Sequence, residues 1–130
     1  MAMFTKFEDI TAWQKARELS ALIFKVTETG KFAKDFALKT QILRSSGSVM
    51  DNIAEGFERG GRKEFVQFLG IAKGSCGEVK SQIYRSIDFG YIDKTQFDNL
   101  YALTDETSKM ISGLMKYLNT STVRGLKFKT

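Results

Sequence analysis

Apolar residues recur every three or four positions along four long stretches of the chain. In the first stretch the repeat comprises Ala12, Ala16, Leu19, Ile23 and Val26, which a helix places on one face. The later stretches keep the same period, and none competes with the two-residue period of a strand. The pattern predicts four amphipathic helices, over residues 9–29, 35–59, 62–89 and 93–118.

Residues that favour helix ends stand at the expected boundaries. Asp9 and Asp35 are suited to cap the first and second helices, because an aspartate carboxylate accepts hydrogen bonds from the first backbone N–H groups. Asp93 and Gln96 have nearly the spacing of a capping box at the start of the fourth helix, and Gly90 suits the left-handed residue that follows the third. The chain has no proline, which fits long helices joined by glycine-containing turns.

The middle of the second helix contains the run Arg44–Ser48, which locally resembles a loop. Serine competes for backbone hydrogen bonds, and glycine costs about 1 kcal/mol relative to alanine in a helix. The helical phase nevertheless carries across this run, from Leu38 and Ile42 to Val49 and Ile53. We therefore predict one continuous helix, whose small residues let a neighbouring helix approach closely.

Four helices of this kind predict an all-α fold, an antiparallel up-down four-helix bundle formed by residues 1–118. Residues 119–130 form a basic C-terminal tail without a sustained period. No stretch approaches the roughly 18 consecutive apolar residues of a membrane span, and the N-terminus lacks the pattern of a signal peptide. We expect a cytoplasmic protein that does not contact a membrane.

The composition excludes several kinds of catalytic site. The 130 residues include no histidine, which excludes Ser–His and Cys–His catalysis and every histidine-ligated metal site. The single cysteine, Cys76, lies in phase with an apolar stripe and is predicted to be a small buried residue. Gly70, Gly74 and Gly77 lie inside a predicted helix, so we interpret them as sites of close helix packing and not as a phosphate-binding loop. We expect no enzymatic activity, no metal and no cofactor.

The positive charge of the chain is concentrated in two segments. The net charge is +5, residues 31–63 carry +3, and residues 119–130 carry another +3. The simpler interpretation is two solvated surfaces, and the more specific one is a patch that binds an anionic partner. The candidate nucleic-acid-binding residues are Arg59, Arg62, Lys63, Arg124, Lys127 and Lys129.

The second helix also carries a polar stripe, offset from its apolar face and rich in short hydrogen-bonding side chains. Such a stripe suits a half-buried structural network that faces the third helix or another subunit. Within it we expect Arg44 to pair with Glu55 or Glu78, since a buried charge must be paired. The predicted network comprises Gln41, Arg44, Ser48, Asn52, Glu55 and Glu78.

Four strings of residues together resemble one known family: Phe7–Ala16, Gln41–Gly56, Lys63–Ser75 and Gly90–Ile92. It comprises the bacterial four-helix-bundle proteins encoded within intervening sequences of 23S ribosomal RNA genes, sometimes labelled S23 ribosomal proteins. Members often have Phe-Pro before the second helix, where this chain has Phe-Ala. The family looks related to the accessory variability protein of diversity-generating retroelements, a basic pentameric barrel that binds a reverse transcriptase and nucleic acid. The resemblance implies a homopentamer without a demonstrated enzymatic activity.

Two functions stay open at this point, with an unrecognised hydrolase ranked far below both. The first is an oligomeric nucleic-acid-binding protein, for RNA above all, that acts through the basic loop and tail residues. The second is a protein-binding adaptor or accessory subunit of a polymerase or reverse transcriptase, whose nucleic-acid affinity is incidental. The first requires a continuous basic surface, whereas the second allows a neutral, partly apolar groove.

Overall fold

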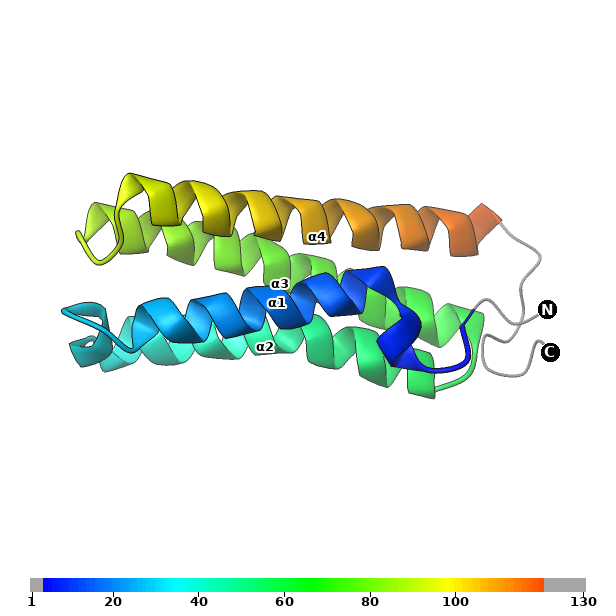
Figure 1. The fold of residues 1–130 in the computed structure, drawn as a ribbon. Helices are drawn as coiled ribbons and strands as arrows, with labels where there is room; N and C mark the ends of the chain where they lie inside the picture. The colour runs from blue at the N-terminus through cyan, green and yellow to red at the C-terminus, as the bar shows by residue number, and fades with distance from the viewer. Residues whose placement is uncertain (1–3, 121–130) are drawn as a thin grey trace.

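The computed structural model describes residues 4–120, which form a bundle of four long antiparallel helices (Figure 1). The order along the chain is α1 (Thr11–Thr27), α2 (Phe36–Glu58), α3 (Arg62–Asp88) and α4 (Lys94–Thr120). Short 3₁₀ helices precede the first two, η1 (Phe7–Asp9) before α1 and η2 (Phe32–Lys34) before α2. The predicted all-α four-helix fold is therefore confirmed. No helix among the described residues is long and apolar enough to cross a membrane.

The cap prediction is wrong for the first helix, which begins at Thr11 behind Ile10. The Asp9 carboxylate instead accepts hydrogen bonds from the Thr5 hydroxyl at 2.9 Å, the Thr5 amide at 3.2 Å and the Lys6 amide at 3.3 Å. These donors precede Asp9, so its side chain closes the 3₁₀ turn η1 and is directed away from α1.

The other predicted helix ends are confirmed. Asp35 Oδ1 accepts a 3.1 Å hydrogen bond from the Leu38 amide at the start of α2. Asp93 and Gln96 exchange side-chain to backbone hydrogen bonds of 2.8 and 2.9 Å, which is a capping box. Gly90 has φ +76°, the left-handed conformation that suits the residue after a helix.

Helix α2 runs without interruption through its serine-rich middle, as predicted. The Ser45 hydroxyl donates to the Gln41 carbonyl at 2.9 Å and the Ser46 hydroxyl to the Leu43 carbonyl at 3.2 Å, so these hydroxyls are satisfied within their own helix. Ser48 Oγ lies 2.9 Å from Ser75 Oγ of α3. Small side chains thus let α2 and α3 pack closely there.

Close helix packing at Gly70, Gly74 and Gly77 was the wrong interpretation of these glycines. A Cβ atom added at Gly74 or Gly77 would have no neighbour within 4 Å, and one at Gly70 would meet only Met115 at an ordinary 3.7 Å. The close approach occurs at Gly56 of α2. A Cβ added there would lie 2.5 Å from Phe68 Cβ of α3, a separation that packed side chains do not tolerate.

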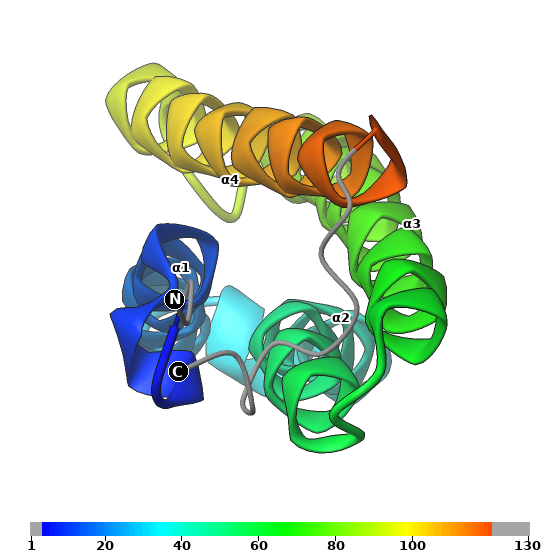
Figure 2. The same ribbon diagram turned by 90° about the vertical axis from the view of Figure 1, so that its right-hand side faces the viewer.

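Buried side chains fill the bundle along its whole length in two clusters. One surrounds Phe57 and Phe65 near the α2–α3 turn, and the other surrounds Phe32 and Ile83 near the opposite end. Viewed along the axis, α1 lies beside α2, α2 beside α3 and α3 beside α4, whereas α1 and α4 are more widely separated (Figure 2). The α1–α4 side is therefore the loosest side of the bundle.

Candidate nucleic-acid interface

The three described cations of the predicted interface lie at the α2–α3 turn, and two of them already have partners. Arg59 forms a 2.9 Å ion pair with Glu55, and its guanidinium lies 5.1 Å from the centre of the Phe68 ring. Arg62 Nη1 donates a 3.1 Å hydrogen bond to the Leu118 carbonyl at the end of α4. Lys63 is exposed and forms no ion pair within residues 4–120. The predicted tail residues lie outside the described part of the chain: Arg124, Lys127 and Lys129.

The carboxylates of this turn offset its cations. Residues 55–64 contain three acidic and three basic side chains, so the segment is neutral. Of the three described candidate cations, Lys63 alone therefore offers an ammonium group that is exposed and forms no ion pair within residues 4–120.

The opposite end of the bundle carries cations that the sequence analysis did not select. Lys31 and Lys34, in the α1–α2 connection, are exposed and form no ion pair within residues 4–120. They line a shallow pocket together with Asp35, Phe36 and Tyr91. Tyr91 comes from the α3–α4 connection, so both connections of this end build the pocket. Residues 25–39 carry a net charge of +2.

Tyr91 is held at this pocket by two contacts. Its hydroxyl donates a 2.7 Å hydrogen bond to Asp35 Oδ2, and its ring centre lies 5.1 Å from that of the buried Phe32. Hydrogen bonds from the Leu38 amide and then from the Tyr91 hydroxyl hold the pKa of Asp35 below its ordinary value. The carboxylate is thus charged at neutral pH and fixes the start of α2 and the Tyr91 ring together.

Two further aromatic rings at this end face solvent. Phe36 is 74% exposed and Phe89 is 50% exposed. The Phe89 ring makes an edge contact with Tyr91, with centres 5.7 Å apart, and the Arg85 guanidinium lies 5.8 Å from its centre. We call Lys31, Lys34, Phe36, Phe89 and Tyr91 the aromatic–basic end. The alternation of lysine and phenylalanine over residues 31–36 is the sequence signal that could have found it.

The predicted polar network is only partly assembled. Asn52 Nδ2 donates hydrogen bonds of 2.8 Å to the Ser48 carbonyl and to Ser48 Oγ, which also contacts Ser75 Oγ. Gln41 Oε1 accepts a 3.0 Å hydrogen bond from Arg85 of α3. The network thus joins α2 to α3 at two places, through the Ser48 and Ser75 hydroxyls and through the Arg85 guanidinium on the Gln41 amide oxygen.

The expected half-buried pairing of Arg44 is wrong. Arg44 and Glu78 are both exposed, and Glu55 is paired with Arg59. Within residues 4–120, the Arg44 side chain has no hydrogen bond or ion pair. The physical reason is exposure: the Arg44 guanidinium stays in contact with water, so its charge does not need a paired carboxylate.

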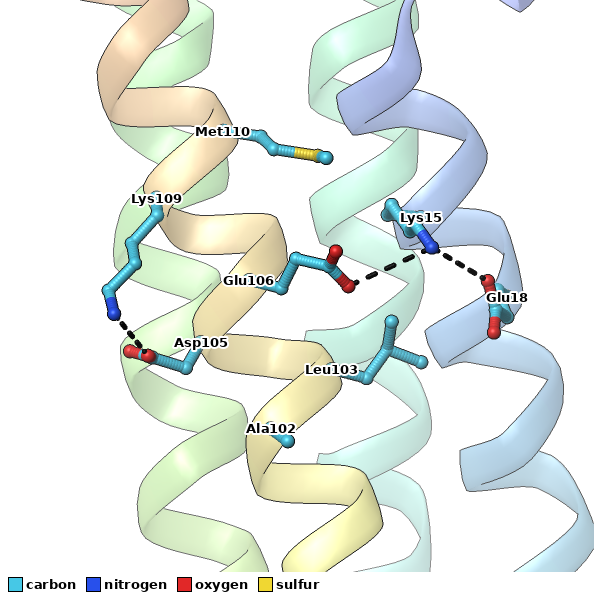
Figure 3. Close-up of a pocket in the computed structure, with 8 residues that line it drawn as sticks. All are labelled: Lys15, Glu18, Ala102, Leu103, Asp105, Glu106, Lys109 and Met110. Carbon is cyan, nitrogen blue, oxygen red and sulfur yellow. Dashed lines mark ion pairs between the residues drawn. The ribbon is translucent and has the colours of Figure 1, made fainter.

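A second surface feature, the α1–α4 groove, follows the loosest side of the bundle. Figure 3 shows its middle part, where Lys15 of α1 lies 3.7 Å from both Glu18 and Glu106. On the α4 side, Lys109 forms a 3.0 Å ion pair with Asp105. Cations and carboxylates therefore offset each other along this stretch.

The two ends of the α1–α4 groove are apolar. Leu22 and Leu100 line a small pocket at one end. Phe4, Leu114 and Met110 line another at the other end, and Met110 also reaches the charged middle part. The groove is thus a neutral, partly apolar channel between α1 and α4.

Comparison with known proteins identifies the family. The family model described as 23S rRNA-intervening sequence protein matches residues 8–113. The chain belongs to this family. A solved crystal structure of a protein with unknown function, from the S23 ribosomal protein family of Bacteroides thetaiotaomicron VPI-5482, has a TM-score of 0.74 and 26% sequence identity. The alignment covers 81% of this chain and 98% of that one. No curated protein matches.

The resemblance inferred from the sequence is therefore confirmed at the level of the 23S rRNA-intervening sequence family. The relation to the accessory variability protein and the homopentamer stay predictions. Within residues 4–120 no group of three or more histidine, cysteine, aspartate or glutamate side chains is placed to hold a metal ion. Cys76 is fully buried, as predicted, and its burial raises the pKa of the thiol to about 11.

Proposed function

We propose that this member of the 23S rRNA-intervening sequence family is a non-enzymatic nucleic-acid-binding protein, with RNA as its principal ligand. The observation that carries the proposal is the pair Lys31 and Lys34, exposed side by side on one pocket without an ion pair in the described chain. A phosphate group can bind such ammonium groups without displacing a carboxylate, and binding releases counterions from the nucleic acid.

The basic turn that the sequence analysis selected has a smaller part in this proposal. Arg59 would have to break its ion pair with Glu55 to bind a phosphate. Arg62 already donates a hydrogen bond to the Leu118 carbonyl at the end of α4. Lys63 remains available, and the tail cations Arg124, Lys127 and Lys129 would add to it. Assembly into a homo-oligomer, which we expect to be a pentamer, would multiply a weak patch into useful avidity.

The test measures the affinity for a short single-stranded RNA as a function of salt. We expect Lys31→Glu with Lys34→Glu to lower the affinity at least about tenfold at low salt and to reduce the slope of log affinity against log salt by about two. The matched control, Lys73→Glu with Lys116→Glu, changes the net charge equally at two other exposed positions. Equal losses in both variants, or no measurable binding by the natural chain, would contradict the proposal.

A second candidate function, the protein-binding adaptor, is favoured by the α1–α4 groove. Its apolar ends and offset charges suit an amphipathic helix of a polymerase or reverse transcriptase. Ala102 is exposed on the wall of the groove, so Ala102→Arg should fill it without disturbing the core. We expect this variant to lose affinity for a purified polymerase or reverse transcriptase that the natural chain binds. Ala21→Arg, at an exposed position of α1 outside the groove, is the control.

A further inference from the structure

The aromatic–basic end exposes rings that the core of the bundle does not use. Phenylalanine is among the residues most often buried, yet Phe36 is 74% exposed at the first position of α2. Phe89, at the end of α3, is half exposed. Single exposed apolar side chains are common on protein surfaces, whereas several that form one contiguous patch are typical of a binding surface.

The rings of this end form one connected surface. Phe36 and Tyr91 line the same pocket, and Phe89 contacts the edge of Tyr91. Tyr91 is itself fixed by Asp35 and by the buried Phe32. A ligand therefore meets a Tyr91 ring already held in place, which reduces the entropy cost of binding.

The cations of the same pocket define which ligand fits these rings. Lys31 and Lys34 would attract phosphates, whereas the charged Asp35 carboxylate, which lines the same pocket and accepts the Tyr91 hydrogen bond, would repel phosphates from the Tyr91 hydroxyl. A ligand in which flat, uncharged rings alternate with phosphates can place its rings on the aromatic side chains and its phosphates on the lysines. Unpaired nucleotides have this chemistry, whereas the bases of a duplex are already stacked on one another.

We infer that Phe36 and Phe89 stack on unpaired bases of single-stranded nucleic acid while Lys31 and Lys34 contact the flanking phosphates. The inference rests on the proposed function and adds to it the preference for single strands. The aromatic contacts supply this preference, and the lysines supply the salt-dependent part of the affinity.

The test compares a single-stranded 12-nucleotide RNA with a hairpin duplex of the same length in pairs. We expect Phe36→Ala and Phe89→Ala each to lower the single-strand affinity by roughly tenfold, the loss typical of one stacked base, and to leave the salt slope and the duplex affinity unchanged. Both side chains are at least half exposed, so the core stays intact. The matched control is Phe24→Ala, at a position of α1 that is 53% exposed.

Photocrosslinking provides a second readout. An oligonucleotide that carries 5-iodouracil should crosslink to the peptides of Phe36, Phe89 or Tyr91. Crosslinks confined to other peptides would overturn the inference, and so would a Phe36→Ala variant that behaves like Phe24→Ala.

Two further results separate the inference from competing explanations. Equal loss of single-strand and duplex affinity would show that the rings serve phosphate binding alone, which overturns the inference and leaves the proposed function standing. A change of mass in light scattering on Phe36→Ala would assign this face to a contact between copies of the chain and overturn the inference. Absence of binding by the natural chain to either RNA would instead contradict the proposed function itself.

Discussion

Arg62 donates a 3.1 Å hydrogen bond from Nη1 to the carbonyl oxygen of Leu118, 56 residues further along the chain. The carbonyl groups in the last turn of a helix lack partners within the helix. The side chain at the start of α3 thus satisfies one of these groups at the end of α4. Arg62, which the sequence predicted to bind phosphate, therefore stabilises the contact between α3 and α4.

Replacement of Arg62 should therefore affect stability more than a surface substitution does. We expect Arg62→Ala to lower the free energy of unfolding by about 1–2 kcal/mol, because a charged donor is lost and the Leu118 carbonyl is left without it. Urea denaturation measures the change. Lys63→Ala, one residue further on and exposed, is the control and should change stability by less than about 0.5 kcal/mol. Equal effects of both substitutions would contradict the assignment.

Gly56 should be the least replaceable glycine of the described helices. An alanine there would bring its Cβ to 2.5 Å from Phe68 Cβ and 3.1 Å from Phe65 Cδ1, so α2 and α3 would have to move apart. We expect Gly56→Ala to destabilise the bundle by about 1–3 kcal/mol. Gly74→Ala meets no atom within 4 Å and should stabilise by about 0.5–1 kcal/mol, because alanine is the better helix former. Thermal unfolding of the two variants would reveal the opposite signs.

The helices could be predicted from the sequence because their signals are local. Asp35 caps α2 because its acceptor atoms lie within reach of the amide three residues later. The exception at Asp9 is local as well: the Thr5 and Lys6 donors compete for its carboxylate, and no periodic pattern shows which donors win. Helix periodicity therefore gives the elements but leaves their ends uncertain by a turn.

The candidate site was harder to predict because it depends on how the helices are placed relative to one another. The partner of Arg62 lies on another helix, and the pocket of Lys31 and Lys34 is completed by Tyr91 from a distant connection. Charge counting located the basic segments but could not show that Glu55 neutralises Arg59. Exposure and pairing of a cation are tertiary properties, and they decide whether it can bind a phosphate.

The corrected polar network gives a third prediction. Arg44 is exposed and lacks a partner in the described chain, so Arg44→Ala should cost less than about 0.5 kcal/mol. Ser75 is buried, and its hydroxyl lies 2.9 Å from that of Ser48, so Ser75→Ala should cost about 1 kcal/mol. Chemical denaturation of both variants tests the order. A larger loss for Arg44→Ala would restore the original idea of a paired, half-buried arginine.

The last prediction concerns stability at alkaline pH, which should depend on Cys76. Burial raises the pKa of this thiol from its ordinary 9.0 to about 11, so the folded chain keeps a proton that the unfolded chain releases above about pH 9. The free energy of unfolding therefore keeps its full value with respect to this thiol below pH 9, and it falls as the pH rises from 9 toward 11. Cys76→Ala lacks the titrating group, and we expect its free energy of unfolding to fall less steeply between pH 9 and 11. The pKa of Lys80 is raised chiefly by its hydrogen bond to Asp105, which both proteins share, whereas the attraction between Lys80 and the Cys76 thiolate is lost in Cys76→Ala. If the free energies of unfolding of the natural chain and of Cys76→Ala fell in parallel over this range, the thiol would be accessible to water and the prediction would be wrong. Rapid alkylation of the native chain by iodoacetamide at pH 8 would lead to the same conclusion.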